Sequence, residues 1–186
     1  MFINYKNKDK KQNTMRKILL FTLLFLTLIV LVTACGRDNN TNNAIVTSDN
    51  IELAYTFTNV NSDKAVLLLH MLGKDKESYN ALTQYLTQNG YTVLAIDFRG
   101  HGESTLDYET FTDKDWEHLV LDVEASVDFL EMQGYDYIAV VGASIGANAA
   151  LKHAVQDTRI DNLVLVSAGE EYHGINALDV VGFYDR

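Results

Sequence analysis

Short apolar runs alternate with stretches of helical periodicity from about residue 44 onward. The runs that predict strands are 51–58, 65–70, 92–97, 137–142 and 162–167. The middle runs are continuously apolar, which is typical of parallel strands that are covered on both faces of a sheet.

Two longer segments between these runs carry apolar residues at helical spacing, residues 77–89 and 113–133. Gly90 and Gly134 follow directly, in the usual position of a helix stop. A third helix is expected just after Ser144. The alternation of strands and helices predicts an α/β fold, a three-layer sandwich in which helices cover both faces of a mainly parallel sheet.

The N-terminal residues do not follow this alternation. A basic stretch precedes the uncharged run 18–32. The end of this run leads into the sequence Val32-Thr33-Ala34-Cys35. The charged start and short apolar centre are typical of a secretory signal, and the last four residues resemble a bacterial lipobox, in which cleavage leaves a cysteine that carries lipid. We therefore expect a lipoprotein signal peptide at residues 1–34 and acyl chains such as palmitate on Cys35. An uncleaved membrane anchor is the alternative, and Met15 is an alternative start.

Charge and composition narrow the partners of the remaining chain. Residues 35–43 are polar and asparagine-rich, which predicts a lipid-anchored tether ahead of a domain at residues 44–186. Without residues 1–34 the chain has nine basic and 24 acidic residues, a net charge of −15. This charge argues against nucleic acid and against electrostatic adhesion to anionic lipid. Attachment to the outer face of a bacterial cell membrane would then depend on lipid at Cys35.

Polar residues follow three of the predicted strands. The strand 137–142 runs into Gly142-Ala143-Ser144-Ile145-Gly146, a G-x-S-x-G sequence in which a serine stands on a sharp strand-to-helix turn. His70-Met71-Leu72-Gly73 and the stretch "DFRGHGES" at 97–104 follow two other strands, at the sheet edge where α/β proteins place their sites. In this order and spacing, the three stretches resemble the α/β-hydrolase family, particularly its monoacylglycerol-lipase and esterase-like branch. The resemblance covers residues 44 to about 170.

The resemblance implies a serine hydrolase of ester or related acyl bonds, acting on a small-molecule substrate through an acyl-enzyme on Ser144, without cofactor or metal. The backbone N–H groups of Leu72 and Ile145 would form the oxyanion hole. Met71 stands where the family usually has glycine. Glu170 is the candidate acid. The single cysteine also excludes a cysteine-based metal cluster.

The histidine that such a mechanism needs is not evident. In the family the chain order is serine, acid, histidine, and only His153 and His173 follow Ser144. His153 lies on the helix that starts at the serine, about 13 Å along its axis at about 1.5 Å per residue, and is out of reach. His173 would need a particular loop path. We therefore expect the base to lie beyond residue 186, so that residues 44–186 form the N-terminal part of the fold without its last strands.

Other interpretations of these residues remain open. His70, His101 and Asp97 are expected to organise loops rather than to catalyse. Gly142 and Gly146 would be needed simply to pack a helix against a strand, so the motif alone does not establish activity. The alternatives to a serine hydrolase are a non-catalytic membrane-anchored lipoprotein that binds an acyl or peptide ligand, and a truncated remnant of an enzyme.

Overall fold

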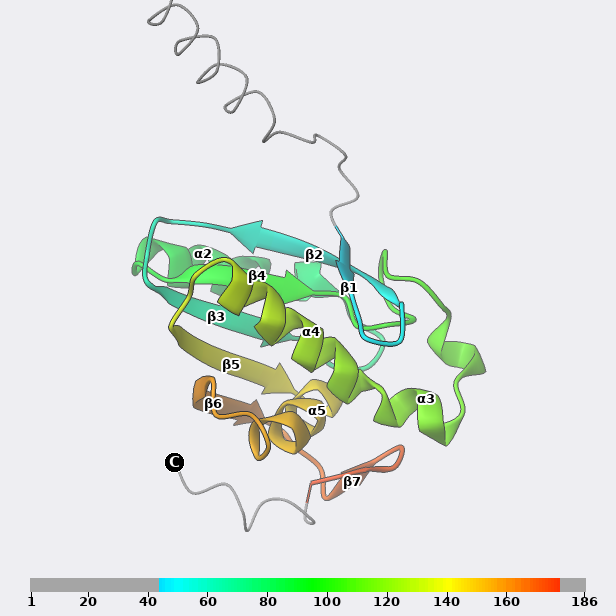
Figure 1. Ribbon diagram of the computed structural model, residues 1–186. Coiled ribbons are helices and arrows are strands. Elements are labelled where there is room, and N and C mark those ends of the chain that lie inside the picture. The colour runs from blue at the N-terminus through cyan, green and yellow to red at the C-terminus, as the bar shows by residue number, and fades with distance from the viewer. Residues whose placement is uncertain (1–43, 178–186) are drawn as a thin grey trace, which may run out of the picture. The chain divides into compact units, whose positions relative to one another are not determined.

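Six strands make up the central sheet in a computed structural model of the protein, which describes residues 44–177 (Figure 1). The strand order is β1-β2-β4-β3-β5-β6. β4, β3, β5 and β6 are parallel, whereas β1 and β2 are antiparallel to their neighbours. The strands are β1 (Ala44–Val46), β2 (Glu52–Thr58), β3 (Lys64–Leu69), β4 (Thr92–Ile96), β5 (Tyr137–Ala143) and β6 (Ile160–Val166). The mainly parallel sheet predicted from the sequence is confirmed, and β1 is an addition to it.

Helices connect most of these strands, and a small hairpin follows the last of them. The helical elements are η1 (Lys76–Tyr79), α2 (Asn80–Gln88), η2 (Tyr108–Thr110), α3 (Asp113–Glu117), α4 (Leu119–Met132) and α5 (Ile145–Ala154). The sequence predicted one helix over residues 113–133, but the structure divides it at His118 into α3 and α4. After β6, a hairpin not predicted from the sequence comprises β7 (Glu171–Tyr172) and β8 (Ile175–Asn176).

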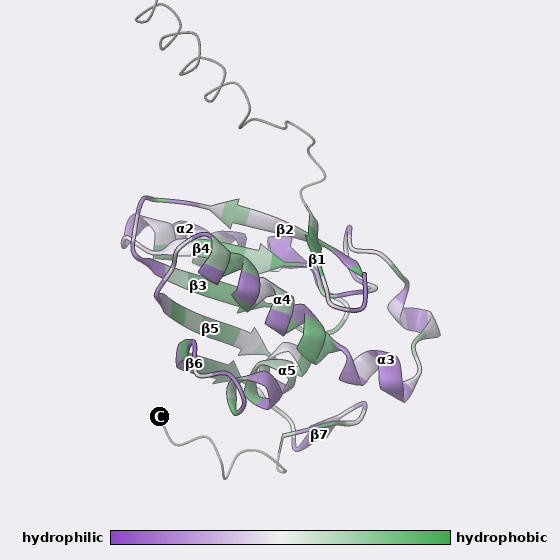
Figure 2. Ribbon diagram, in the orientation of Figure 1, coloured by the Kyte–Doolittle hydropathy of each residue, from purple (hydrophilic) through white to green (hydrophobic). Residues whose placement is uncertain are grey.

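The sheet lies between two helical layers. Alternate strand residues face opposite ways, and two separate apolar clusters result. Leu67, Leu69, Leu94 and Ile96 belong to the cluster that includes α4 and α5, whereas Val66, Leu68, Val93 and Ala95 pack against α2 and η1. Figure 2 shows apolar residues along β3, β4 and β5, in contrast to the mixed polarity of the helices. Burial on both faces explains why the sequence of these strands is continuously apolar.

Strand β6 forms one edge of the described sheet. It pairs with β5 alone among the described strands. Val164, Leu165 and Val166 are 50%, 36% and 48% exposed, so apolar side chains on this strand contact water to an extent not seen in β3 or β4. An unpaired apolar strand of this kind is a site of edge-to-edge association.

Several sequence predictions fall outside the described residues. The signal peptide at 1–34, Cys35 and the tether lie before residue 44, and residues 178–186 lie after the described part. Within residues 44–177, every helix is too short or too polar to cross a bilayer, and no group of side chains in this part is arranged to hold a metal ion.

Candidate active site

Ser144 lies at the turn between β5 and α5. Its backbone has φ 50° and ψ −118°, a conformation that costs a residue with a side chain about 1–3 kcal/mol. Hydrogen bonds hold it on both sides. Its N–H donates to the carbonyl of Val166 at the end of β6 (2.9 Å), and its carbonyl accepts from the N–H groups of Ala147 and Asn148 (2.9 and 3.1 Å). The strain is therefore built into the end of the sheet.

The two glycines of the motif allow α5 to approach the sheet closely. A Cβ atom on Gly142 would lie 2.4 Å from the carbonyl oxygen of Gly146, and one on Gly146 would lie 2.5 Å from that of Leu69. Real Cβ atoms do not approach a backbone oxygen so closely, so any side chain here would force α5 outward. The start of α5 consequently lies directly against the end of β3 and the loop that follows.

His70 organises this loop through both nitrogens of its ring. The N–H of Phe98 donates to Nε2 (3.0 Å), and Nδ1–H donates to the carbonyl of Met71 (2.8 Å), an assignment that follows because an amide N–H can only donate. The ring is buried, and burial lowers the pKa of His70 from 6.5 to about 4. A neutral imidazole with both nitrogens engaged is a structural element, not a free base.

Asp97 has a comparable role in the loop after β4. Its carboxylate accepts hydrogen bonds from the backbone N–H groups of Lys76 and Glu103 (2.7 and 2.9 Å) and from the Lys76 ammonium (2.7 Å). Burial opposes the charge of Lys76, but the hydrogen bonds to Asp97 and Glu103 outweigh burial and raise the pKa of Lys76. A Cβ atom on Gly102 would collide with this carboxylate. Asp97 therefore fixes the loop, and its oxygens are occupied.

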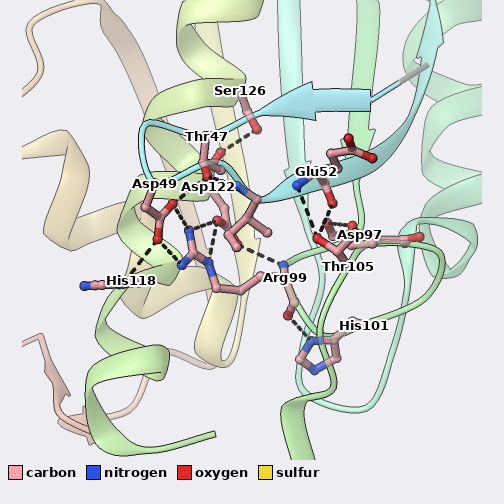
Figure 3. A network of polar contacts seen from close by, with 12 residues as sticks. Thr47, Asp49, Glu52, Asp97, Arg99, His101, Thr105, His118, Asp122 and Ser126 are labelled. Atoms are coloured by element: carbon pink, nitrogen blue, oxygen red, sulfur yellow. Dashed lines mark hydrogen bonds and ion pairs between the residues drawn. The ribbon is translucent and has the colours of Figure 1, made fainter. Parts of the chain in front are cut away.

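Arg99 centres a buried ionic network that the sequence interpretation missed (Figure 3). Its Nε donates to Asp122 on α4 (2.8 Å), and its two terminal nitrogens donate to Asp49 in the β1–β2 turn (2.7 and 3.0 Å). Nδ1 of His118 lies 3.3 Å from Asp49. The network fastens the loop after β4 to α4 and the β1–β2 turn. The available signal was Asp122, an aspartate among the apolar positions of a helix.

An aromatic column extends from the His70 loop toward α3. His101 lies 5.1 Å from His70 between ring centroids and stacks on Tyr108 at 4.4 Å. Trp116 of α3 lies 6.3 Å from His101 and stacks on His173 of the β7–β8 turn at 4.6 Å. Burial lowers the pKa of His101. Its Nδ1–H donates to the carbonyl of Arg99 (3.0 Å), and among the described residues Nε2 is the one buried side-chain nitrogen or oxygen without a hydrogen-bond partner.

The remaining candidate residues contact groups other than the Ser144 hydroxyl. Nε2 of His153 lies 2.8 Å from a carboxylate oxygen of Asp157 near the far end of α5. His173 is exposed and stacks on Trp116. Glu170 is exposed, and its backbone carbonyl accepts a hydrogen bond from the N–H of Ala177 (2.9 Å). Within residues 44–177, no side chain is hydrogen-bonded to the Oγ of Ser144, so the described part assigns it no base.

The geometry leaves two backbone donors near the serine turn. Leu72 follows Met71 in the His70 loop, and Ile145 is the first residue of α5, whose initial N–H groups have no partner within the helix. Within the described residues, neither N–H donates a hydrogen bond to another group. Met71 is 44% exposed, whereas Leu72 is partly buried against the core. Met71, which stands where the family usually has glycine, therefore does not block the N–H of Leu72.

The strand order, the strained serine turn and the loops at the carboxyl ends of β3 and β4 define an α/β hydrolase. Residues 60–180 match the family model described as serine aminopeptidase, S33, and the chain belongs to this family of α/β hydrolases. Among curated proteins, it is 35% identical over 96 residues to a carboxylesterase of Bacillus subtilis (strain 168), covering 52% of this chain and 38% of the relative. It is 27% identical over 128 residues to a non-heme chloroperoxidase of Burkholderia pyrrocinia, covering 67% and 44% respectively.

Solved structures give the same result. An esterase of Pyrococcus furiosus superposes with a TM-score of 0.60 and 32% identity, covering 67% of this chain and 50% of the esterase. An esterase from Exiguobacterium antarcticum, with a TM-score of 0.56 and 20% identity, shares the fold. The chain thus spans half or less of the length of these relatives.

Proposed function

We propose that the protein is a carboxylic ester hydrolase in which Ser144 is the nucleophile. The observation that carries this proposal is the strained serine turn, with two unengaged N–H groups beside it. Residues held in a conformation that costs about 1–3 kcal/mol cluster at active sites, and here the strained residue is the serine of the G-x-S-x-G turn. The names of the relatives, a carboxylesterase and an esterase, support an ester or related acyl bond as the target.

The proposed reaction proceeds through an acyl-enzyme. The Oγ of Ser144 attacks the acyl carbon as a general base takes its proton, and the carbonyl electrons move onto oxygen. The N–H groups of Ile145 and Leu72 receive this oxyanion, an interaction worth about 2.7–4 kcal/mol for one donor in a measured case. The intermediate collapses, the C–O bond to the alcohol breaks, and the alcohol leaves with a proton. Water then attacks the acyl carbon, the bond between this carbon and Oγ breaks, the carboxylic acid leaves and Oγ takes back a proton.

The described residues do not supply the general base that this reaction needs. Because no described side chain is hydrogen-bonded to Oγ, residues 44–177 by themselves should support slow turnover. Enzymes that lack one member of the triad still retain about 10³–10⁴-fold catalysis over water through the oxyanion hole and binding. Glu170 would serve as the acid that orients the histidine of a complete triad. A small diffusible base such as imidazole should accelerate the acylation of Ser144.

We further propose that the protein is anchored on the extracytoplasmic face of a bacterial cell membrane by lipid on Cys35. The support is the lipobox-like sequence at residues 32–35, which lies outside the described part of the structure. The location would place an ester hydrolase beside lipids and other acyl compounds of the envelope. Two acyl chains are needed for stable anchoring, since a single chain binds membranes only marginally.

A fluorophosphonate probe tests the proposed nucleophile. Such probes phosphonylate an activated serine, so with imidazole added as the base we expect a single adduct on Ser144 by mass spectrometry and none in Ser144→Ala. Ser167→Ala is the matched control, because Ser167 also has a positive φ (54°) but stands outside the G-x-S-x-G turn. Hydrolysis of p-nitrophenyl acetate should be slow and should rise with imidazole concentration. A folded protein that remains unlabelled, or that is labelled equally well in Ser144→Ala, contradicts the proposal. Loss of turnover in His173→Ala would assign the base to the hairpin.

A further inference from the structure

Asn148 is a fully buried polar residue one helical turn after the nucleophile. Its Nδ2 donates to the carbonyls of Gly169 and Ile175 (3.1 Å each), and its Oδ1 accepts from the N–H of Gly169 (3.0 Å). Its own N–H donates to the carbonyl of Ser144 (3.1 Å). Only one orientation of the amide fits two carbonyls and one N–H group, so the three bonds define it. One side chain thus joins the start of α5 to the segment after β6.

The segment it holds is the β7–β8 hairpin, residues 171–176. Two residues with positive φ, His173 and Gly174, form its turn (48° and 81°), as tight hairpin turns require. Each strand has two residues, and an isolated hairpin is at best marginally stable in water. Its shape and position must therefore come from the contacts it makes with the rest of the domain.

At its turn the hairpin reaches α3. His173 stacks on Trp116 with ring planes 17° apart, and a Cβ atom on Gly174 would lie 3.2 Å from a carboxylate oxygen of Glu117. The hairpin carries Glu170 and Glu171 at its base, and α3 begins with Asp113 and Asp115. Because both sides are acidic, electrostatic attraction does not hold them together. Figure 1 shows the hairpin beside α5 and below α3, at the end of the molecule to which β5 points.

We propose that Asn148 is a positioning residue whose amide fixes the β7–β8 hairpin as a rigid wall between α5 and α3, beside Ser144. The role of this wall in placing substrate rests on the proposed function, whereas the position of the hairpin does not. Each bond that Asn148 makes is to backbone, so it determines where the segment lies regardless of the side chains the segment carries. Loss of the amide would remove these three hydrogen bonds from the backbone of Gly169 and Ile175 and loosen the attachment of the hairpin to α5.

Trp116 reports the position of the hairpin directly. It is the sole tryptophan of the chain and is 6% exposed, with the His173 ring against its face. In the full chain, quenching of its fluorescence by acrylamide should therefore be weak. Asn148→Ala should increase the quenching constant by the same factor as His173→Ala. The double variant should show the same increase as either single variant, not the product of the two. Non-additivity between two residues that do not touch is the signature of one shared element.

The matched control is Ser126→Ala, which removes a buried hydrogen bond on α4 (Oγ to the carbonyl of Asp122, 2.7 Å) far along the chain from the hairpin. It should lower stability without changing the quenching. Asn148→Asp keeps the acceptor for the Gly169 N–H but loses both donors, and it serves as the second variant if Asn148→Ala does not fold. Quenching at the parent level in a folded Asn148 variant, or factors that multiply in the double variant, would overturn the positioning role.

Enzyme kinetics tests separately whether the hairpin helps to place the substrate. With a p-nitrophenyl ester as substrate, Asn148→Ala should raise KM more than it lowers kcat, because the nucleophile turn is held by other bonds. Ser126→Ala should change neither parameter. An uncovered Trp116 with unchanged KM would overturn the role in substrate placement. Absence of any fluorophosphonate labelling in the parent would instead refute the proposed function, while the fluorescence result would still decide how the hairpin is held.

Discussion

Acid should destabilise this domain through the buried imidazole of His70. The ring is neutral in the fold, where Nε2 accepts the N–H of Phe98 (3.0 Å). Protonation would place a hydrogen on Nε2, opposite an amide that can only donate. Burial accordingly lowers the pKa of His70 from 6.5 to about 4. The unfolded chain, with the ordinary pKa, therefore binds a proton first as the pH falls.

The direction and size of the change in the free energy of unfolding follow from this difference in pKa between the folded and unfolded states. Between pH 6.5 and 4 the unfolded state binds more protons than the folded state, so the free energy of unfolding falls as the pH falls through this window. A shift of about 2.5 units at about 1.4 kcal/mol per unit gives about 3–4 kcal/mol. This is a large share of the about 5–15 kcal/mol by which domains are ordinarily stable. The contribution is fully present above pH 6.5 and fully lost below about pH 4.

Other groups titrate nearby and must be separated from His70. Burial also lowers the pKa of His101, which acts in the same direction. Burial raises the pKa of Asp122 to about 6, against the attraction of Arg99, and this carboxyl acts in the opposite direction between pH 6 and 3.8. Asp49 has a lowered pKa, mainly through its hydrogen bond with Arg99, so its stabilisation is lost below pH 3.8. A comparison of variants is therefore needed rather than one pH profile.

The assay is urea unfolding of residues 36–186 from pH 7.5 to 4.5. His70→Gln keeps an amide oxygen to accept the Phe98 N–H but does not titrate, so its profile should be flatter than that of the parent by most of the about 3–4 kcal/mol. His173→Gln, the same substitution at an exposed histidine, should leave the parent profile unchanged. Parallel profiles for the parent and His70→Gln would refute the reasoning.

Three further predictions concern the helix contact, the sheet edge and the anchor. Gly146→Ala should cost about 1–3 kcal/mol and slow fluorophosphonate labelling, because its Cβ would lie 2.5 Å from a backbone oxygen; Gly169→Ala, whose nearest contact is 3.4 Å, should do neither. Val164→Lys should reduce aggregation and binding of the dye ANS by residues 36–186, since a charge on an exposed edge strand opposes association; unchanged dye binding would refute this. Cys35→Ser should abolish incorporation of labelled fatty acid and partitioning with membranes; a label that survives the change contradicts lipidation there.

The strands of the sheet were predictable because their cause is local. Residues 65–69 and 93–96 are apolar at every position, and the structure shows why, since alternate residues enter two different apolar clusters. The capping box of Thr112 and Asp115, with both side chains bonded across the start of α3, is likewise set by residues three apart. Such features depend on neighbours in the sequence, so one sequence is enough to infer them.

The features that the sequence did not reveal depend on distant partners. The division of the 113–133 helix occurs at His118, which contacts Asp49, a residue far away in the sequence. Arg99 is buried because two aspartates 50 and 23 residues away neutralise it. Asn148 gave no signal at all, since a small polar residue after a serine motif is ordinary, and its backbone partners are 21 and 27 residues away. No local pattern specifies contacts of this kind.

Each loop around Ser144 is fixed by its own buried polar residue, and this independence shapes what the protein can do. His70 holds the loop after β3, Asp97 the loop after β4, and Asn148 the segment after β6, each mainly through bonds to backbone. The turn at Ser144 is itself held by the end of β6 and the first turn of α5. None of these bonds involves the Oγ of Ser144. The nucleophile and the proposed oxyanion donors are therefore positioned by the described residues alone, and proton abstraction is a separate requirement. This division of roles predicts that Ser144 reacts slowly both with a fluorophosphonate and with esters, and that imidazole accelerates both reactions.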